Sequence, residues 1–187
     1  MILQGVDSKV APSFSLRNRM ARAIWEIVYV LFFLPTPRAC HAWRRTVLRA
    51  FGAQVGAGAH IYPRVKIWAP WNLSIGALAG VANGVTLYSM EKIILGERCV
   101  ISQGAHLCTG SHNFNDPLFQ LTAQPISIGH DAWICAEAFV CPGTEIADGA
   151  VVGARSVVTR SLRESWTVYA GMPAKRISIR TGSGEKQ

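Results

Sequence analysis

Aliphatic residues recur at every sixth position through the second half of the chain, at Ile128, Ile134, Val140, Ile146, Val152 and Val158. A small residue follows four positions after each of the first five, at Ala132, Ala138, Thr144, Ala150 and Ser156. An amphipathic helix repeats its apolar positions about every 3.6 residues and a half-buried strand every 2, so neither explains this period. A period of six is typical of a parallel β-helix, in which each six residues form one short strand and one corner.

The same period continues toward the N-terminus in three further sets. Their aliphatic positions are Leu95, Ile101 and Leu107, then Ile75, Val81 and Leu87, then Val55, Ile61 and Ile67. Two extra residues separate these sets, at 73–74 and at 93–94, and we expect corners that bulge outward there. Three sixes make one triangular coil, and each coil buries its interior only by stacking on its neighbours. The sequence therefore predicts a mainly β protein, with a β-helix of about five coils over residues 55–163.

The repeat has one long interruption. After Leu107 the next repeat begins at Ile128, which leaves residues 113–127, NFNDPLFQLTAQPIS, as an extra loop. A long loop in an otherwise tightly periodic fold is usually functional. His112 stands immediately before this loop, and a neutral imidazole is the commonest general base near pH 7. Its position favours a catalytic histidine over an ordinary surface residue.

Residues 1–54 predict two helices that precede the β-helix. The first runs from a cap at Ser13 or Ser15 to about Leu34, and its apolar end, IWEIVYVLFFL, is too short to cross a bilayer. The second, over about residues 38–51, is expected to bury one side and expose the other. The apolar side carries Trp43, Val47 and Phe51, and the basic side carries Arg38, Arg44, Arg45 and Arg49. Either the helices simply cap the open end of the β-helix, or residues 14–51 also touch a membrane surface.

Positive charge is concentrated at the two ends of the chain. The net charge is +8; residues 1–54 carry eight Lys and Arg against two acidic residues, and residues 155–187 carry seven against two. Such an excess favours an anionic partner, either a membrane surface or a phosphorylated ligand. We do not expect nucleic acid, because no tract alternates basic and aromatic residues in the way that stacks bases.

The cysteines and the first residues indicate the compartment. Five cysteines, an odd number, favour a reducing environment without disulfides. The start, MILQGVDSKV, lacks the basic region and apolar core of a secretory signal. We therefore expect a cytoplasmic protein, at the inner face of the membrane if the N-terminal helices make that contact.

Several segments of residues 13–180 together resemble the hexapeptide-repeat O-acetyltransferases, in particular the colanic-acid and exopolysaccharide branch related to galactoside, maltose and nodulation-factor acetyltransferases. They are the repeats themselves, TGSHNFNDPLF, PISIGHDAWI, VVGARSVVTR and AGMPAKRI. The resemblance implies a left-handed coil, a homotrimer with active sites between subunits, acetyl-CoA as co-substrate and no metal. It also implies that the acceptor is a hydroxyl of a saccharide.

The resemblance carries roles onto individual residues. His112 would be the general base that takes a proton from the acceptor hydroxyl. The acceptor side would comprise Asn83, Ser111, Asn113 and Trp133. The CoA side would comprise Ala136, Ala154, Thr159 and Arg160, together with Lys175 and Arg176 in the C-terminal segment and tail, 164–187. Arg160 stands where the relatives have lysine and keeps the positive charge. Glu137 could assist His112, although nothing in the sequence orients it.

Three alternatives stay open at this point. One is N-acetylation of an amino sugar by the same machinery. Another is a β-helix carbonic anhydrase, with zinc held by His106, His112 and His130, although their spacing matches no metal signature. The last is a non-catalytic β-helix binding protein, which would not bind CoA.

Overall fold

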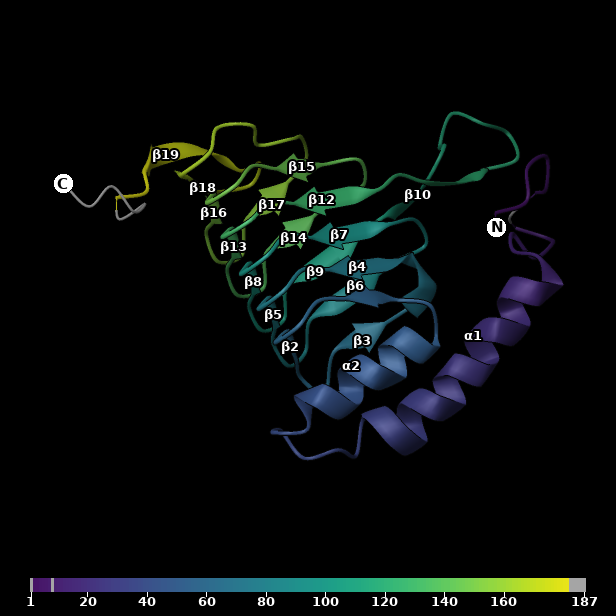
Figure 1. Cartoon of the computed structure of the whole chain (residues 1–187). Coiled ribbons are helices and arrows are strands. Elements are labelled where there is room, and N and C mark those ends of the chain that lie inside the picture. Colours follow the sequence, from purple (N-terminus) through teal and green to yellow (C-terminus); the bar gives the residue numbers. More distant parts are fainter. Residues whose placement is uncertain (1, 8, 182–187) are drawn as a thin grey trace.

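The computed structural model describes residues 2–7 and 9–181, which form a solenoid of short parallel strands preceded by two helices (Figure 1). The C-terminal tail expected from the sequence lies, from residue 182 on, outside the described residues.

The strands of the solenoid lie on three faces. Face one consists of β1 (Gln54–Val55), β4 (Leu73–Ile75), β7 (Ile93–Leu95), β12 (Ile126–Ile128) and β15 (Glu145–Ile146). Face two consists of β2 (His60–Ile61), β5 (Gly80–Val81), β8 (Val100–Ile101), β13 (Trp133–Ile134), β16 (Val151–Val152), β18 (Thr167–Ala170) and β19 (Lys175–Ile179). Face three consists of β3 (Lys66–Ile67), β6 (Thr86–Tyr88), β9 (His106–Cys108), β14 (Phe139–Val140) and β17 (Val157–Val158). The predicted fold of about five coils is confirmed, since five coils are complete and β18 belongs to a partial sixth.

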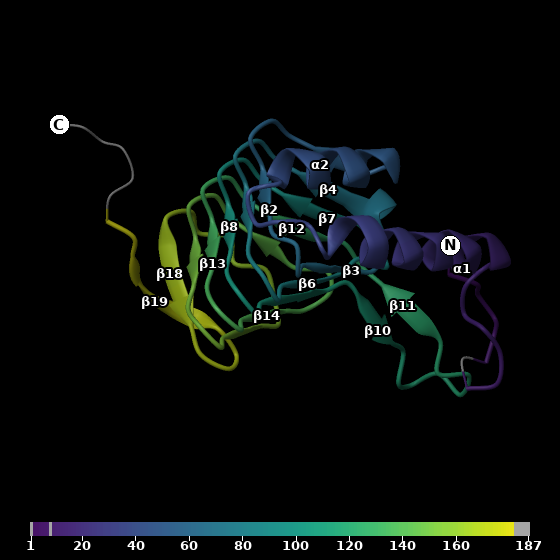
Figure 2. The same ribbon diagram turned by 90° about the horizontal axis from the view of Figure 1, so that it is seen from below.

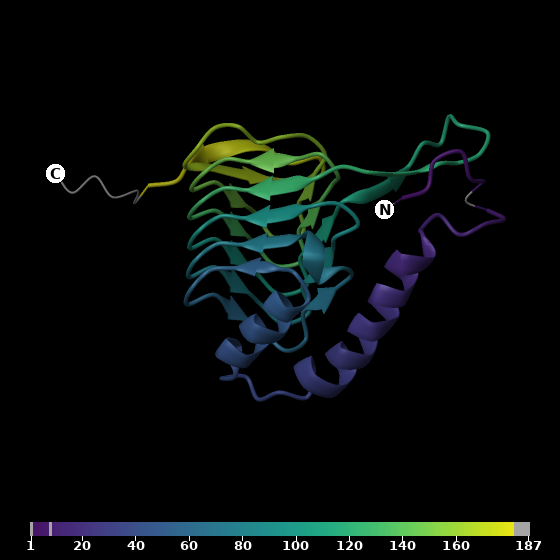
Figure 3. The same ribbon diagram turned by 45° about the vertical axis from the view of Figure 1, so that its right-hand side comes forward.

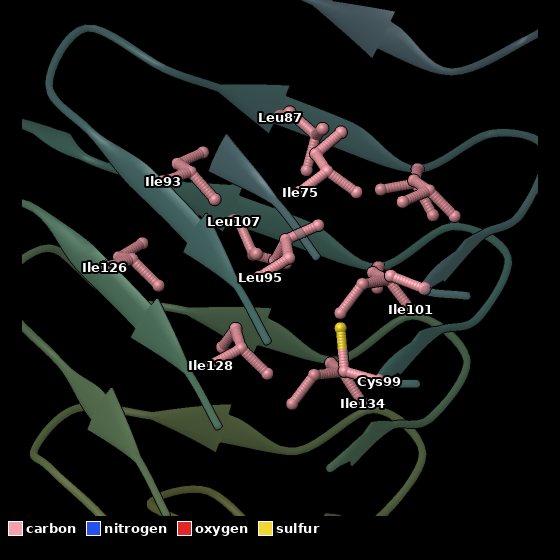
Figure 4. Packing of buried hydrophobic residues seen from close by; sticks show 14 of the residues in the cluster. Ile75, Leu87, Ile93, Leu95, Cys99, Ile101, Leu107, Ile126, Ile128 and Ile134 are labelled. Atoms are coloured by element: carbon pink, nitrogen blue, oxygen red, sulfur yellow. The ribbon is translucent and has the colours of Figure 1, made fainter. Parts of the chain in front are cut away.

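The period of six places one aliphatic column inside each face. On face two the strands from β2 to β18 pair in parallel register, so that interior residues of successive coils lie directly above one another, and β19 runs antiparallel to β18. That column is Ile61, Val81, Ile101, Ile134 and Val152, all fully buried. Figure 4 shows labelled residues of the three columns meeting in the centre of the solenoid. Full burial of each aliphatic side chain contributes on the order of 1.5–3 kcal/mol, so the stack of coils is the main source of stability.

The two short insertions lie slightly before the positions that the period indicated. Leu73 and Ile93 are buried parts of β4 and β7, and they pair in register with each other and with Ile126. The extra residues instead form the corner between faces three and one, as the 3₁₀ turn η2 (Pro70–Asn72) and residues 90–92. Leu73 and Ile75 are both apolar, as are Ile93 and Leu95, so the sequence pattern alone does not decide where the extra residues lie. The burial of Leu73 and Ile93 shows that the extra residues precede them.

The long interruption is an antiparallel hairpin rather than an irregular loop. Its strands, β10 (Gly110–His112) and β11 (Leu121–Ala123), leave the same corner between faces three and one and extend away from the solenoid (Figures 1 and 3). Seen along the solenoid, the N-terminal segment lies beside this hairpin (Figure 2). The two are joined through Gln120, whose side chain bonds the backbone of Gly5 and Val6. The solenoid resumes with β12.

Two helices cover the N-terminal end of the solenoid. α1 (Leu16–Val28) begins at Ser15, whose hydroxyl accepts a bond from the Asn18 N–H at 3.3 Å, and it continues as the π-helical turn η1 (Tyr29–Phe33). α2 (His41–Ala50) lies across the first coil (Figures 1 and 3). The helices bury Trp25, Phe33, Val47 and Leu48 against the solenoid.

Arg44 fixes α2 to its surroundings. Its side chain is completely buried, although the helical pattern placed it on the polar side of the second helix. Its Nε donates to the carbonyl of Ile61 at 2.6 Å, and its Nη1 donates to the Thr36 hydroxyl at 2.7 Å and the Pro37 carbonyl at 2.9 Å. Its Nη2 donates to the Arg38 carbonyl at 2.6 Å. One guanidinium therefore joins the first coil, the connection between the helices and α2.

The outer side of α1 and η1 remains uncovered. Leu16, Met20, Ile24, Ile27 and Leu31 follow one another at helical spacing, and each is more than half exposed. In the part of the chain that the structure describes, no helix combines the length and apolar character needed to cross a membrane. The exposed apolar residues thus form a stripe along one side of a surface helix, which we call the α1 stripe.

Candidate active site

His112 ends β10 and lies on the projecting hairpin. The His112 backbone pairs with Leu121 of β11. This pairing places His112 where the two strands end and the tip of the hairpin begins. The imidazole ring stacks on the ring of Phe119, with centroids 4.3 Å apart and planes 14° from parallel. The side chain is half-buried, so it combines a fixed orientation with access from outside.

A backbone carbonyl determines which ring nitrogen of His112 can act as a base. Nδ1 lies 2.9 Å from the carbonyl oxygen of Phe119. A carbonyl only accepts hydrogen bonds, so Nδ1 carries the proton in this contact. In the neutral imidazole the lone pair is then on Nε2. The hairpin therefore presents Nε2 as the proton acceptor.

The residues beside His112 are exposed and belong to the same hairpin. Ser111 pairs with Thr122 across the hairpin. The Asn113 N–H donates to the Gln120 carbonyl at 2.8 Å, and its side-chain oxygen accepts a bond from the Asn115 N–H at 3.2 Å. Ser111 and Asn113, two of the four residues expected on the acceptor side, thus directly flank His112.

The hairpin tip also contacts the N-terminal segment. The Gly5 N–H donates to Gln120 Oε1 at 2.9 Å, and the Lys9 ammonium lies 5.7 Å from the centre of the Phe119 ring. No pattern in the sequence pointed to these contacts, because the bond between Gly5 and Gln120 joins residues 115 positions apart. These contacts help to hold Phe119, whose carbonyl orients the His112 ring.

A second group of expected site residues lies along the corner between faces two and three. Three of them, Asn83, Ala136 and Ala154, each follow the buried column residue of face two by two positions. Gln103, which was not predicted, takes the same position in the coil between Asn83 and Ala136, so the four residues stack in successive coils. The Arg155 N–H donates to the Ala136 carbonyl at 2.9 Å, and the Asn83 side chain accepts a bond from the Arg64 N–H at 3.1 Å. This corner is a regular column of small or polar residues along the solenoid.

Two other residues lie close to this column. Trp133 is 44% exposed on face two, and its indole N–H donates to the Ser102 hydroxyl at 2.9 Å, which fixes the ring against the surface. Glu137 lies on the corner itself and pairs with Arg155 at 2.6 Å. Because Glu137 is on a different corner from His112, it does not orient the histidine of its own chain.

The cations of the C-terminal part gather at the far end of the solenoid. Arg160, Arg163, Lys175 and Arg176 line a hollow of about 480 Å³. One acidic residue, Glu164, also lines it and pairs with Arg176 at 3.1 Å. Thr159 is exposed directly after β17, next to Arg160. The structure therefore brings together the three cations expected at the CoA phosphates, with β18 between Arg160 and the other two in the sequence.

The turn before β19 joins this hollow to the corner between faces two and three. The Val157 N–H donates to the Gly171 carbonyl at 3.0 Å, and the Ala174 N–H donates to the Val157 carbonyl at 2.8 Å. The corner thus leads from Ala136 through Ala154 to this turn, and the turn leads to the cationic hollow. His112 lies on the other edge of face three, so one chain does not bring the base and this column together.

The thiols and potential metal ligands offer little other chemistry. Burial raises the pKa of Cys99 to about 12 and also raises the pKa of Cys135 and Cys141, so these thiols stay protonated and are poor nucleophiles. Within residues 2–7 and 9–181, His, Cys, Asp and Glu side chains nowhere form a group of three able to hold a metal ion.

Comparisons with known proteins identify relatives that match most of the chain. No protein-family model matches it. Over 165 residues the chain is 41% identical to WcaF of Escherichia coli, provisionally named a colanic acid biosynthesis acetyltransferase, and the match covers 88% of the chain and 90% of the relative. A hexapeptide-repeat acetyltransferase of Vibrio cholerae, complexed with acetyl-coenzyme A, superimposes with a TM-score of 0.82 at 20% identity, over 91% of this chain and 93% of that one. A galactoside acetyltransferase in complex with coenzyme A gives a TM-score of 0.79 at 21% identity, over 90% of this chain and 85% of that one.

Proposed function

The chain belongs to the hexapeptide-repeat acetyltransferases, and from that premise we propose that it transfers the acetyl group of acetyl-CoA to a saccharide hydroxyl in the biosynthesis of an exopolysaccharide or related glycan. The observation that carries the proposal is the contact between His112 Nδ1 and the Phe119 carbonyl at 2.9 Å. It leaves Nε2 free to accept a proton at an accessible position. The Escherichia coli relative, named for colanic acid biosynthesis, supports a saccharide acceptor.

The reaction needs one base and no covalent enzyme intermediate. Nε2 of His112 takes the hydroxyl proton while the oxygen attacks the thioester carbonyl carbon of acetyl-CoA. The tetrahedral intermediate then expels the CoA thiolate, which receives the proton from the imidazolium. The products are the acetyl ester and CoA with a free thiol, and His112 returns to its starting form. Holding both substrates side by side supplies much of the rate, and backbone N–H groups would stabilise the oxyanion.

We propose that the complete site forms between two copies of the chain in a homotrimer. His112, with Ser111 and Asn113, would come from the hairpin of one copy. Trp133 would come from face two of the next copy, and Asn83 from the corner between faces two and three of that copy. The separation of these groups on different edges of face three supports this arrangement. Sedimentation velocity at micromolar concentration tests it, and a stable monomer that is fully active would contradict it.

Acetyl-CoA is the proposed co-substrate, and its path follows the corner between faces two and three. Backbone groups of Ala136 and Ala154 would hold the pantetheine arm. Thr159, Arg160, Lys175 and Arg176 would meet the nucleotide end. The cationic hollow of about 480 Å³ at the end of that corner supports this direction.

Replacing Lys175 and Arg176 together by Glu should weaken CoA binding at least about tenfold. A contact between a cation and a phosphate is worth roughly 1–3 kcal/mol, and each change also introduces repulsion. Losing the exposed ion pair between Arg176 and Glu164 has little effect on folding. Isothermal titration calorimetry with CoA measures the change, and Arg17→Glu at the opposite end of the molecule is the control. Equal affinity in the wild type and the double variant would show that the phosphates bind elsewhere.

We also propose that the α1 stripe rests on the inner face of the cytoplasmic membrane. Its five exposed apolar residues are accompanied by Arg17 and Arg19 on the same helix. Such a combination favours binding in the interface of an anionic bilayer. Flotation with anionic vesicles should retain the wild type and lose the variant Ile24→Gln/Ile27→Gln. Retention of both proteins, or of neither, would contradict the contact.

The test of the proposed function is acetyl-CoA consumption against a panel of glycans and nucleotide sugars. We expect turnover with at least one acceptor that offers a free hydroxyl. The product should release its acetyl group with hydroxylamine, as an ester does and an amide does not. A product resistant to hydroxylamine would identify N-acetylation of an amino sugar instead.

A further inference from the structure

The carbonyl that orients His112 belongs to a residue in a strained conformation. Phe119 has a φ of 48°, in the left-handed region that residues other than glycine rarely adopt. Its carbonyl oxygen lies 2.9 Å from Nδ1 of His112. A strained conformation of this kind persists only where the surrounding structure enforces it. The orientation of the base therefore depends on the contacts that hold Phe119 in place.

Hydrogen bonds within the tip of the hairpin hold Phe119 from one side. The Phe119 N–H donates to the Asp116 carbonyl at 2.8 Å, and the Asp116 carboxylate accepts a bond from the Leu118 N–H at 2.9 Å. The tip projects away from the solenoid (Figure 3), and none of residues 113–119 is buried. Bonds that the tip makes to itself therefore do not fix its place relative to the rest of the molecule.

Gln120 is buried, unlike the preceding residues of the tip, and it joins two distant parts of the chain. Its main-chain carbonyl accepts a bond from the Asn113 N–H at 2.8 Å, which extends the pairing of the hairpin strands one step beyond His112. Its side-chain Oε1 accepts a bond from the Gly5 N–H at 2.9 Å, and its Nε2 donates to the Val6 carbonyl. Both polar atoms of the amide thus bind the N-terminal segment, residues 2–7.

The N-terminal segment is itself attached to α1 and to the solenoid. The Leu3 N–H donates to the Ser13 carbonyl at 2.8 Å, and Ile2 forms an antiparallel bridge with Phe14. The Phe14 ring lies 4.9 Å from the ring of Trp68, measured between centroids. Figures 2 and 3 show the segment between the start of α1 and the hairpin. The tip is therefore connected to the body of the molecule by a second route besides its own two strands.

We propose that Gln120 is a positioning residue for acetyl transfer, an inference that rests on the proposed function of His112. By binding the N-terminal segment, its amide holds the tip so that the Phe119 carbonyl stays against Nδ1 of His112. Nε2 then keeps its lone pair and its direction toward the acceptor. When both side-chain bonds are lost, the carbonyl leaves Nδ1, and the ring rotates and exchanges tautomers. The fraction of molecules with a correctly placed base then falls.

Gln120→Met tests this role, because methionine keeps the length of the side chain and removes both hydrogen bonds. We expect kcat to fall at least about tenfold, since a misplacement of about 1 Å can cost on the order of 10²-fold in rate. The KM for acetyl-CoA should stay within about twofold. Gln124→Met is the matched control, because Gln124 is exposed and directly follows β11. Its kcat should stay within about twofold of the wild type, as for most surface substitutions.

The same substitution in a His112→Ala background separates positioning of the base from a general structural role. If Gln120 acts through His112, no base remains to be misplaced, and the double variant should be at most about twofold slower than His112→Ala alone. If Gln120 instead supports the hairpin as a whole, Ser111 and Asn113 are displaced with it. The double variant would then lose about a further tenfold, the full effect of an independent substitution, and that result overturns the proposal.

A spectroscopic measurement of His112 needs no turnover. Nitrogen-15 NMR of protein labelled at histidine reports which ring nitrogen carries the proton in the neutral imidazole, and the signals absent from His112→Ala identify His112. The wild type and Gln124→Met should show the proton on Nδ1, as the contact with the Phe119 carbonyl requires. Gln120→Met should show a mixture of the two tautomers. A tautomer unchanged from the wild type in Gln120→Met overturns the proposal.

Failure of this inference and failure of the proposed function give different results. If His112→Ala keeps the wild-type kcat, the assignment of the base is wrong, and the role of Gln120 falls with it. If His112→Ala loses at least about a hundredfold while Gln120→Met keeps the wild-type kcat, the base is correct and only the role of Gln120 is wrong.

Discussion

His112→Ala is expected to lower kcat by at least about a hundredfold, since general-base catalysis by a placed side chain is typically worth 10²–10⁴. A saccharide hydroxyl is a poor nucleophile until its proton is removed, and Nε2 is the group that the Phe119 carbonyl leaves available. Residual activity should remain from substrate positioning and oxyanion contacts. The KM for acetyl-CoA should change far less than kcat, because the lost interaction acts mainly in the transition state.

Folding and CoA binding should both survive this substitution. His112 lies on the projecting hairpin outside the aliphatic columns, so its truncation opens no cavity in the core. His130→Ala is the matched control, because His130 is an exposed solenoid residue that accepts a bond from the Glu97 N–H at 3.1 Å. Steady-state kinetics with an acceptor found in the panel of glycans and nucleotide sugars measure kcat for both variants. If His112→Ala keeps more than about a third of the wild-type kcat, a general-base role worth 10² or more is wrong.

Arg44→Met is expected to destabilise the N-terminal cap by about 3 kcal/mol or more, because the buried guanidinium donates four hydrogen bonds, each worth about 0.5–1.5 kcal/mol. The substitution removes the donors to Thr36, Pro37 and Arg38 and one donor to Ile61, while methionine roughly keeps the volume. A repeat protein need not unfold in one step, so amide hydrogen exchange in α2 is the suitable measurement. Exchange there should accelerate by about a hundredfold, which corresponds to that free energy.

The neighbouring Arg45 supplies the control for this prediction. Its side chain is half-buried and donates one bond, to the Ala59 carbonyl at 3.0 Å. Arg45→Met should therefore cost less than about 1.5 kcal/mol. Similar exchange rates in the two variants would mean that the buried guanidinium does not hold the cap in place.

The interior of the solenoid could be predicted from the sequence because it repeats. A strict period of six fixes the side of every strand that faces inward, and Ile101, Ile134 and Val152 are buried as the period requires. Arg44 shows where such pattern reasoning fails. A helical pattern assigns arginine to solvent, and only the folded chain reveals four main-chain and hydroxyl oxygens around the guanidinium.

The candidate site could be located from the sequence but not assembled from it. The long interruption of the repeat drew attention to His112, and the structure places it on a hairpin. The contact that selects its tautomer involves the carbonyl of Phe119, and main-chain oxygens leave no mark in a sequence.

The corner between faces three and one contains every insertion between consecutive complete coils. It holds the turn at 70–72, the residues at 90–92 and the whole hairpin, while the other two corners keep a constant spacing. A segment inserted there projects outward and shifts no strand, so the register of the coils above and below it is preserved. Under the proposed function, acceptor choice would diversify by exchange of this one segment. The corner assigned to CoA would keep its geometry, so hairpins from other acetyltransferases are natural grafts for redirecting specificity.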